Sequence, residues 1–186
     1  MIKYFTHTLF LILTFSLAGF AQKAGNAKND ALLKAQETEV KAAFDRLVEG
    51  INQADADKVM SVYYNDPKTL FFNYNGTATI GWQNMYDNRK SSYAKRSNVN
   101  LEITGLRIEM LSPTSAYASC KWKQTQEFEA KLEQSTGRMT LVFKKIGKDW
   151  KVLHLHTSPD SFPSEVIIPP SEKTDNENLE RKRVNE

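Results

Sequence analysis

Apolar side chains recur at helical spacing in the first half of the chain and at every second position in the second half. The helical repeat is clearest where five apolar side chains fall on one side of a helix, namely Val40, Phe44, Leu47, Val48 and Ile51. A short second helix is predicted to begin after Asp55, whose carboxylate can cap its first turn. A third helix is predicted after Gly81, where aromatic and apolar residues again repeat at helical spacing.

The strand-like half begins near residue 99, where apolar and polar residues start to alternate. The alternation changes phase at Gly105, which predicts a β-bulge or bend at that glycine. Bent strands let an open sheet curl around a cavity. Further strands are predicted over residues 115–128, 138–146 and 150–158, with a polar connection over residues 129–137.

A short strand over residues 69–74 is predicted to precede the third helix, and Asn75-Gly76 is typical of a hairpin turn. The expected order is therefore two helices, a short strand, a third helix and then four long antiparallel strands. Helices that come first and strands that come last favour the α+β class over a parallel α/β sheet.

The first 21 residues have the features of a secretory signal peptide. Lys3 supplies a positive charge, residues 9–17 are apolar, and small residues precede a predicted cleavage site before Gln22. The apolar run is shorter than the roughly 20 residues that span a bilayer. We therefore expect the mature protein to be exported, periplasmic or extracellular, and free of the membrane.

The rest of the chain is predicted to hold one domain. Residues 22–31 are small and polar and predict a disordered lead-in, residues 32–165 carry the periodic pattern, and residues 166–186 predict a disordered polar tail. The formal charge of +3 on 186 residues includes no concentrated basic stripe, so no nucleic-acid partner is expected. The one cysteine, Cys120, falls in a predicted strand and is expected to be a buried, unreactive thiol.

The last predicted strand carries the most suggestive side chains. Side chains of a strand alternate between two faces, so His154, His156 and Ser158 are predicted to share one face. We expect this face to be the floor of a pocket, with Trp122 and Gln124 beside it on a neighbouring strand. Two alternatives remain open, in which the histidines are structural groups or lie at a dimer interface.

Four aromatic residues outside the sheet are candidates for the pocket wall, namely Tyr63, Tyr64, Trp82 and Tyr86. Core packing is the alternative for each of them. No metal site is predicted, because the two neighbouring histidines lack a third protein ligand. No cofactor is predicted either, since phosphate-binding glycine loops and Cys-x-x-Cys pairs are absent from the sequence.

Several segments, in this order, resemble the nuclear transport factor 2-like superfamily. They are Asn52-Gln-Ala-Asp-Ala-Asp57, Val62-Tyr-Tyr64, Gly76 followed by Gly81, and the strand from Trp150 to Ser158. The resemblance is closest to the SnoaL-like branch and to the association domain of calcium/calmodulin-dependent kinase II. It implies a cone-shaped, cystatin-like fold over residues 32–165, in which a bent antiparallel sheet packs against three helices around a hydrophobic pocket. It also implies a homodimer formed through the outer face of the sheet.

The resemblance leaves the function open, because members of this superfamily include isomerases, dehydratases, cyclases and association modules. The leading hypothesis is an exported domain that binds a small, largely apolar molecule in the cone pocket. The alternatives are an isomerase, dehydratase or cyclase with a pocket His or Tyr as acid or base, and a non-catalytic association module. No inward-facing strand carboxylate is predicted, and the mostly neutral inward positions do not predict an arginine-lined pocket.

Overall fold

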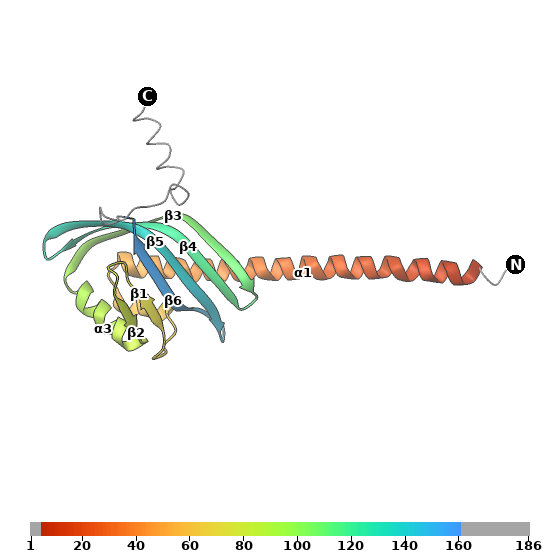
Figure 1. The fold of residues 1–186 in the computed structure, drawn as a ribbon, viewed down its shortest axis with the longest axis horizontal. Coiled ribbons are helices and arrows are strands. Elements are labelled where there is room, and N and C mark those ends of the chain that lie inside the picture. The colour runs from red at the N-terminus through yellow and green to blue at the C-terminus, as the bar shows by residue number, and fades with distance from the viewer. Residues whose placement is uncertain (1–4, 161–186) are drawn as a thin grey trace, which may run out of the picture.

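The computed structural model describes the backbone of residues 5–160 and the side chains of residues 28–160. Its helices are α1 (Phe5–Asn52), α2 (Ala56–Val62) and α3 (Trp82–Tyr93), and its strands are β1 (Leu70–Phe72), β2 (Ala78–Ile80), β3 (Arg96–Ser112), β4 (Ser115–Phe128), β5 (Lys131–Ile146) and β6 (Asp149–Pro159). The strands form one sheet in the order β2-β1-β6-β5-β4-β3 (Figure 1). All neighbours are antiparallel except β1 and β6, which are parallel. The predicted α+β class is confirmed.

Helix α1 is longer than the sequence pattern predicts. It runs without interruption through residues 22–31, for which no regular structure is predicted. Among the residues that the structure describes, no helix is both long and apolar enough to cross a bilayer. Cleavage of the first 21 residues stays a prediction, and the predicted tail over residues 166–186 lies outside the described residues.

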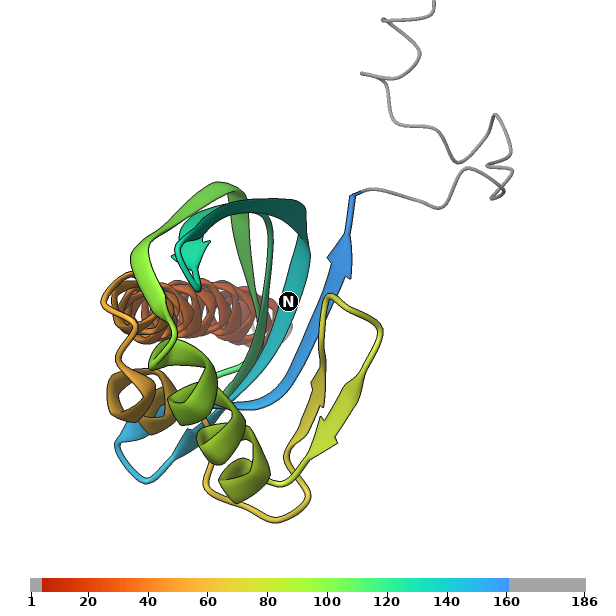
Figure 2. The same cartoon turned by 90° about the vertical axis from the view of Figure 1, so that its left-hand side faces the viewer.

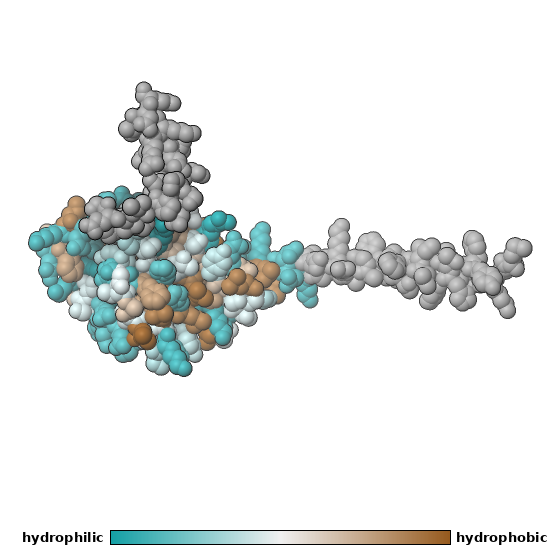
Figure 3. Space-filling view, viewed as in Figure 1, coloured by the Kyte–Doolittle hydropathy of each residue, from teal (hydrophilic) through white to brown (hydrophobic). Residues whose placement is uncertain are grey.

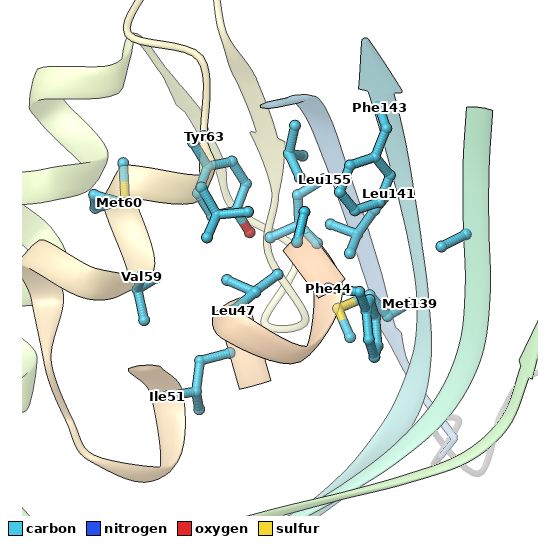
Figure 4. Packing of buried hydrophobic residues seen from close by; sticks show 14 of the residues in the cluster. Phe44, Leu47, Ile51, Val59, Met60, Tyr63, Met139, Leu141, Phe143 and Leu155 are labelled. Carbon is cyan, nitrogen blue, oxygen red and sulfur yellow. The ribbon is translucent and has the colours of Figure 1, made fainter. Parts of the chain in front are cut away.

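The apolar stripe of α1 packs against the inner face of the sheet and forms the core. Phe44 and Leu47 are almost fully buried, and they face Met139, Leu141 and Leu155 of the sheet (Figure 4). Removing a side chain of this size from water stabilises a fold by roughly 1.5–3 kcal/mol. Because the stripe has helical spacing and the strands alternate, each element buries one side only, and the predicted core is confirmed.

Polar contacts fix where α1 lies on the sheet. The carboxylate of Glu39 accepts a hydrogen bond from Lys145 Nζ at 2.6 Å and another from Trp150 Nε1 at 3.1 Å. The hydrogen bond from Lys145 and its positive charge lower the pKa of Glu39. Near the other end of the contact, the backbone N–H of Leu101 donates to Asn52 Oδ1 at 2.6 Å.

The sheet is curved because β3 departs from regular pairing with β4. Register shifts occur between Ser97 and Asn100, between Thr104 and Arg107, and between Met110 and Ser112. Gly105, with a φ of 62°, lies in the middle shift, so the bulge predicted from the phase change is confirmed. In Figure 2 the long strands arch over the C-terminal part of α1, and α3 lies across the opposite side.

Two strands differ from the predicted pattern. β2 was not predicted, and it pairs with β1 across the turn at Gly76, where φ is 81°. β5 begins at Lys131, seven residues before the predicted start at 138. The first residues of β5 and the last of β4 form an arm that leaves residues 131–134 exposed, so this part of the strand carries no apolar alternation. The arm closes through Glu129 and Ala130, both with positive φ, as tight hairpin turns require.

Candidate functional site

A cavity of about 300 Å³ lies between the inner face of the sheet and the helices. Its apolar lining comes from α1, α3 and three strands, and consists of Leu47, Ile51, Met85, Leu101, Met139 and Leu155. Trp122 of β4 and Tyr63, which follows α2, add aromatic surface. The β1–β2 hairpin contributes Tyr74, whose ring meets the Trp122 ring edge-on at 5.9 Å between centroids.

The polar lining consists of neutral amide and hydroxyl side chains and two arginines, which are its charged residues among those that the structure describes. Arg89 lies on α3, where Met85, Arg89 and Tyr93 follow one another at intervals of one helical turn and all line the cavity. Arg96 is the first residue of β3. Arg89 and Arg96 were not predicted as site residues, because only the inward strand positions were considered for an arginine-lined pocket. Arg89 belongs to a helix, and Arg96 precedes the alternating run.

Tyr93 connects the two arginines. Arg89 Nη1 donates a hydrogen bond to the Tyr93 hydroxyl at 2.9 Å. The guanidinium carbons of Arg89 and Arg96 each lie 5.8 Å from the centre of the Tyr93 ring, within the range of a cation–π contact. Burial lowers the pKa of Arg96, and the neighbouring positive charge of Arg89 lowers it further. Both side chains keep their charge at neutral pH, since arginine does not release its proton in proteins.

Three side-chain N–H groups of the cavity lining are buried and have no acceptor among the described residues. They are Nε of Arg89, Nε of Arg96 and Nε1 of Trp122. Two glutamines of β4 also line the cavity and are themselves paired. Gln124 Nε2 donates to Gln126 Oε1 at 2.6 Å, and Gln126 Nε2 donates to the exposed Glu133 at 2.8 Å.

Of the nine residues predicted for the site, Tyr63, Trp122 and Gln124 line the cavity. Burial raises the pKa of the Tyr63 hydroxyl to about 12, so this side chain stays protonated at neutral pH. Trp122 lies over Gly137, its partner on β5. Because glycine has no side chain, the indole can approach the backbone of β5 and leave the cavity above it open.

The two histidines do not line the cavity, and their predicted orientation is wrong. The pairing of β5 with β6 shifts between Val142 opposite His154 and Phe143 opposite Val152, so Leu153 is an extra residue in β6. After this bulge the phase is reversed. Leu155 and Thr157 line the cavity, whereas His154, His156 and Ser158 alternate with them and lie on the outer face.

The burial pattern of β6 marks this bulge, but the sequence hides it. Trp150 and Val152 are buried two residues apart, but the next buried residue, Leu155, follows at an odd interval. Because Leu153 is also apolar, the alternation of apolar and polar residues in the sequence does not reveal the change of phase. No glycine lies at this bulge, unlike the bulge at Gly105. On the outer face His154 Nδ1 lies 3.0 Å from the carbonyl oxygen of Leu70, and the Phe72 ring meets both imidazoles edge-on.

The other three predicted aromatic residues are not part of the cavity lining. Trp82 stacks on Tyr86 with 5.2 Å between ring centroids. Trp82 Nε1 donates to the Met60 carbonyl at 2.9 Å, and the Tyr86 hydroxyl donates to Asp57 at 2.8 Å. Both residues therefore attach α3 to α2. Tyr64 attaches the chain to β6 through its backbone N–H, which donates to Val152 O.

Within the described part of the chain, no group of three or more His, Cys, Asp or Glu side chains is placed to hold a metal ion. The lining of the cavity contains no carboxylate, imidazole, thiol or lysine from the described residues. Its chemistry is that of neutral amides and hydroxyls, two cations and apolar surface.

Comparison with known proteins agrees with this fold. The sequence profile of the SnoaL-like domain matches residues 40–162. No functionally curated protein matches the chain. Among solved structures, a nuclear transport factor 2-like superfamily protein from Salmonella enterica serovar Typhimurium is 22% identical, with a TM-score of 0.65 over 72% of this chain and 99% of that one.

Two further similar structures carry names of different functional classes. A ketosteroid isomerase-like protein from Erwinia carotovora atroseptica is 16% identical, with a TM-score of 0.57 over 67% of this chain and 96% of that one. A provisionally named calcium/calmodulin-dependent protein kinase II association domain from Xanthomonas campestris is 19% identical, with a TM-score of 0.57 over 69% of this chain and 88% of that one. These likenesses establish the fold. The profile match shows that this chain belongs to the SnoaL-like domain family, and the likeness to the Salmonella structure shows that it has the nuclear transport factor 2-like fold.

Proposed function

We propose that this protein binds a small, largely apolar molecule in the cavity under the sheet. The cavity itself carries the proposal. A hollow of about 300 Å³ is at the lower end of the range of small-molecule sites, which are mainly apolar with a few placed polar groups. The surrounding core is closely packed, with Leu47, Phe71 and Phe143 fully buried. An association module needs no such hollow, so the cavity favours ligand binding over assembly alone.

Binding is also better supported than acid–base catalysis. A general base must lie within hydrogen-bond reach of the proton that it removes. His154 and His156 are on the outer face, and no carboxylate of the described residues lines the cavity. Tyr63 lines it, but with a pKa of about 12 its hydroxyl is a poor base at neutral pH.

Export and dimerisation complete the proposal. Residues 1–21 have the charge, apolar run and small residues of a signal peptide, so we expect the mature protein to begin at Gln22 outside the cytoplasm. Apolar surface gathers over β1, β2 and β6 on the outer face (Figure 3), where Phe72 and Ile80 are 42% and 61% exposed. A second copy that covers this surface would explain its composition. Cell fractionation, N-terminal sequencing and sedimentation of wild type and Ile80→Lys test these two points.

Ligand binding is tested by thermal unfolding against a library of small apolar and amphipathic molecules. A ligand present at 100 times its dissociation constant should stabilise the fold by about 2.7 kcal/mol. Ser135→Trp fills the cavity, because Ser135 lines it, and should abolish the stabilisation. The matched control is Thr140→Trp, on the same strand but on the outer face opposite His156. A wild type that no library member stabilises, or a Ser135→Trp variant that binds as wild type does, contradicts the proposal.

A further inference from the structure

Two cations on the cavity wall have no counterion among the described residues. Arg89 and Arg96 both line the cavity, and neither takes part in any salt bridge within residues 28–160. Two other arginines in this part of the chain are paired, since Arg107 lies near Glu109 and Arg138 near Asp160, and Arg46, which makes no salt bridge, is exposed to solvent. A partly buried positive charge is costly without a partner.

The buried side-chain atoms without a hydrogen-bond partner also gather at this cavity. Four such side-chain atoms occur in the described part of the chain, and three of them are N–H donors of cavity residues: Arg89 Nε, Arg96 Nε and Trp122 Nε1. The fourth is Asp160 Oδ1, which lies 3.5 Å from Arg138 Nε. A buried donor without an acceptor destabilises the protein, because it has lost its hydrogen bonds to water and gained none. All three unpaired donors belong to the lining of one cavity, where a bound ligand is placed to supply the acceptor.

The guanidinium groups are held in place before any ligand arrives. Tyr93 is only 6% exposed and accepts the hydrogen bond from Arg89 Nη1, so its ring is fixed. Both guanidinium groups pack against this ring at the same distance, and Arg96 also packs on Phe128. Ordering charged side chains in advance lowers the entropic cost of binding.

Glu133 is the carboxylate of this chain that acts on Arg96 and is therefore a candidate counterion. Its negative charge raises the pKa of Arg96, and its carboxylate accepts a hydrogen bond from Gln126. Glu133 is exposed on the arm formed by β4 and β5, and it makes no salt bridge with Arg96. One exposed carboxylate that makes no salt bridge does not satisfy two arginines.

We infer that the ligand is an organic carboxylate, whose anionic group is held by Arg89 and Arg96 and whose apolar or aromatic body lies along Trp122 and the apolar floor. The inference rests on the proposed function, since it concerns the same cavity. A guanidinium group presents parallel N–H donors that match the two oxygens of a carboxylate. The small volume and the apolar floor favour a compact acid with one charge.

The test compares matched pairs of aromatic and aliphatic carboxylic acids and their primary amides, by calorimetry with the wild-type full chain at neutral pH. The members of a pair differ in charge and hardly in size. We expect the acids that bind to do so at least about tenfold more tightly than their amides, since one lost charge-assisted hydrogen bond corresponds to about 1.5–3 kcal/mol. The affinity of the acids should also fall as salt concentration rises.

Variants locate the charge effect. Arg89→Gln and Arg96→Gln should each weaken binding of the acids about tenfold or more and leave the amides nearly unchanged. Arg107→Gln is the matched control, because Arg107 lies on β3 with its side chain 77% exposed and outside the cavity lining. Glu133→Gln should strengthen binding of the acids or leave it unchanged. The comparison of acid and amide uses the wild-type protein. It therefore tests whether the ligand must carry a carboxylate even if Arg89→Gln does not fold.

Each outcome is decisive. Preference for acids that disappears in Arg89→Gln and Arg96→Gln supports the inference. If amides or neutral molecules bind as tightly as acids, the carboxylate inference is overturned and the proposed function stands. If neither the acids, the amides nor the neutral library of the previous section binds, both fail.

Discussion

The Nδ1 atom of His154 lies 3.0 Å from the carbonyl oxygen of Leu70 and connects β6 to its parallel neighbour β1. This contact belongs to the outer face of the sheet. His154 therefore helps to attach the short strand β1 to β6, whereas Arg89 and Arg96 are the charged residues that line the cavity.

His154→Ala should lower the free energy of unfolding by about 0.5–1.5 kcal/mol, the usual contribution of one hydrogen bond. The affinity for any cavity ligand should not change. Urea unfolding and calorimetry measure the two quantities. His156→Ala is the control, because His156 is exposed and has no hydrogen bond among the described contacts. A loss of ligand affinity in His154→Ala would contradict the prediction and show that His154 contributes to the binding site.

Gly137→Ala should distort the cavity floor. A β-carbon at this position would lie 2.8 Å from Cζ2 of Trp122 and would also collide with the Ser158 carbonyl oxygen. Overpacking of this kind destabilises a protein by about 1–3 kcal/mol. Urea unfolding and ligand titration of Gly137→Ala, with Thr136→Ala as the neighbouring control, measure the effect. Unchanged stability and affinity would mean that Trp122 does not depend on the glycine.

The thiol of Cys120 should be protected in the folded protein. It is 7% exposed, and burial raises its pKa from 9.0 to about 11. Only the thiolate reacts, so labelling by a disulfide reagent at pH 8 should be about 100-fold slower than in urea. Equal rates in the two states would show that Cys120 is accessible.

Tyr63 should make the fold less stable at high pH. Its folded pKa of about 12 exceeds the usual value of 10.0, so the folded state holds the proton more tightly. The resulting stability is complete below pH 10 and is lost as pH rises from 10 to 12, by about 3 kcal/mol. Urea unfolding at several pH values should show this extra loss in wild type and not in Tyr63→Phe. The difference between the two proteins cancels other alkaline effects, including the titration of Cys120. The same dependence of unfolding free energy on pH in wild type and Tyr63→Phe would contradict the prediction.

Local pattern was enough to predict most of the fold. The apolar stripe from Val40 to Ile51, the cap at Asp55 and the phase change at Gly105 all lie where the structure has a buried helix face, a capped helix and a bulge. Asp55 accepts a hydrogen bond from the backbone N–H of Lys58 at 2.9 Å, as expected for a cap. These features depend on residues close together in the chain, so their spacing is visible in the sequence.

The site was decided by tertiary structure. The sequence placed Tyr63, Trp122 and Gln124 near a pocket, but it could not show that the extra residue Leu153 turns His154 and His156 to the outer face. It also could not show that Arg89 of a helix and Arg96 of a strand meet at the ring of Tyr93. Which residues face a cavity depends on strand register and on how helices pack across the sheet, and both are set by contacts between residues far apart in the chain.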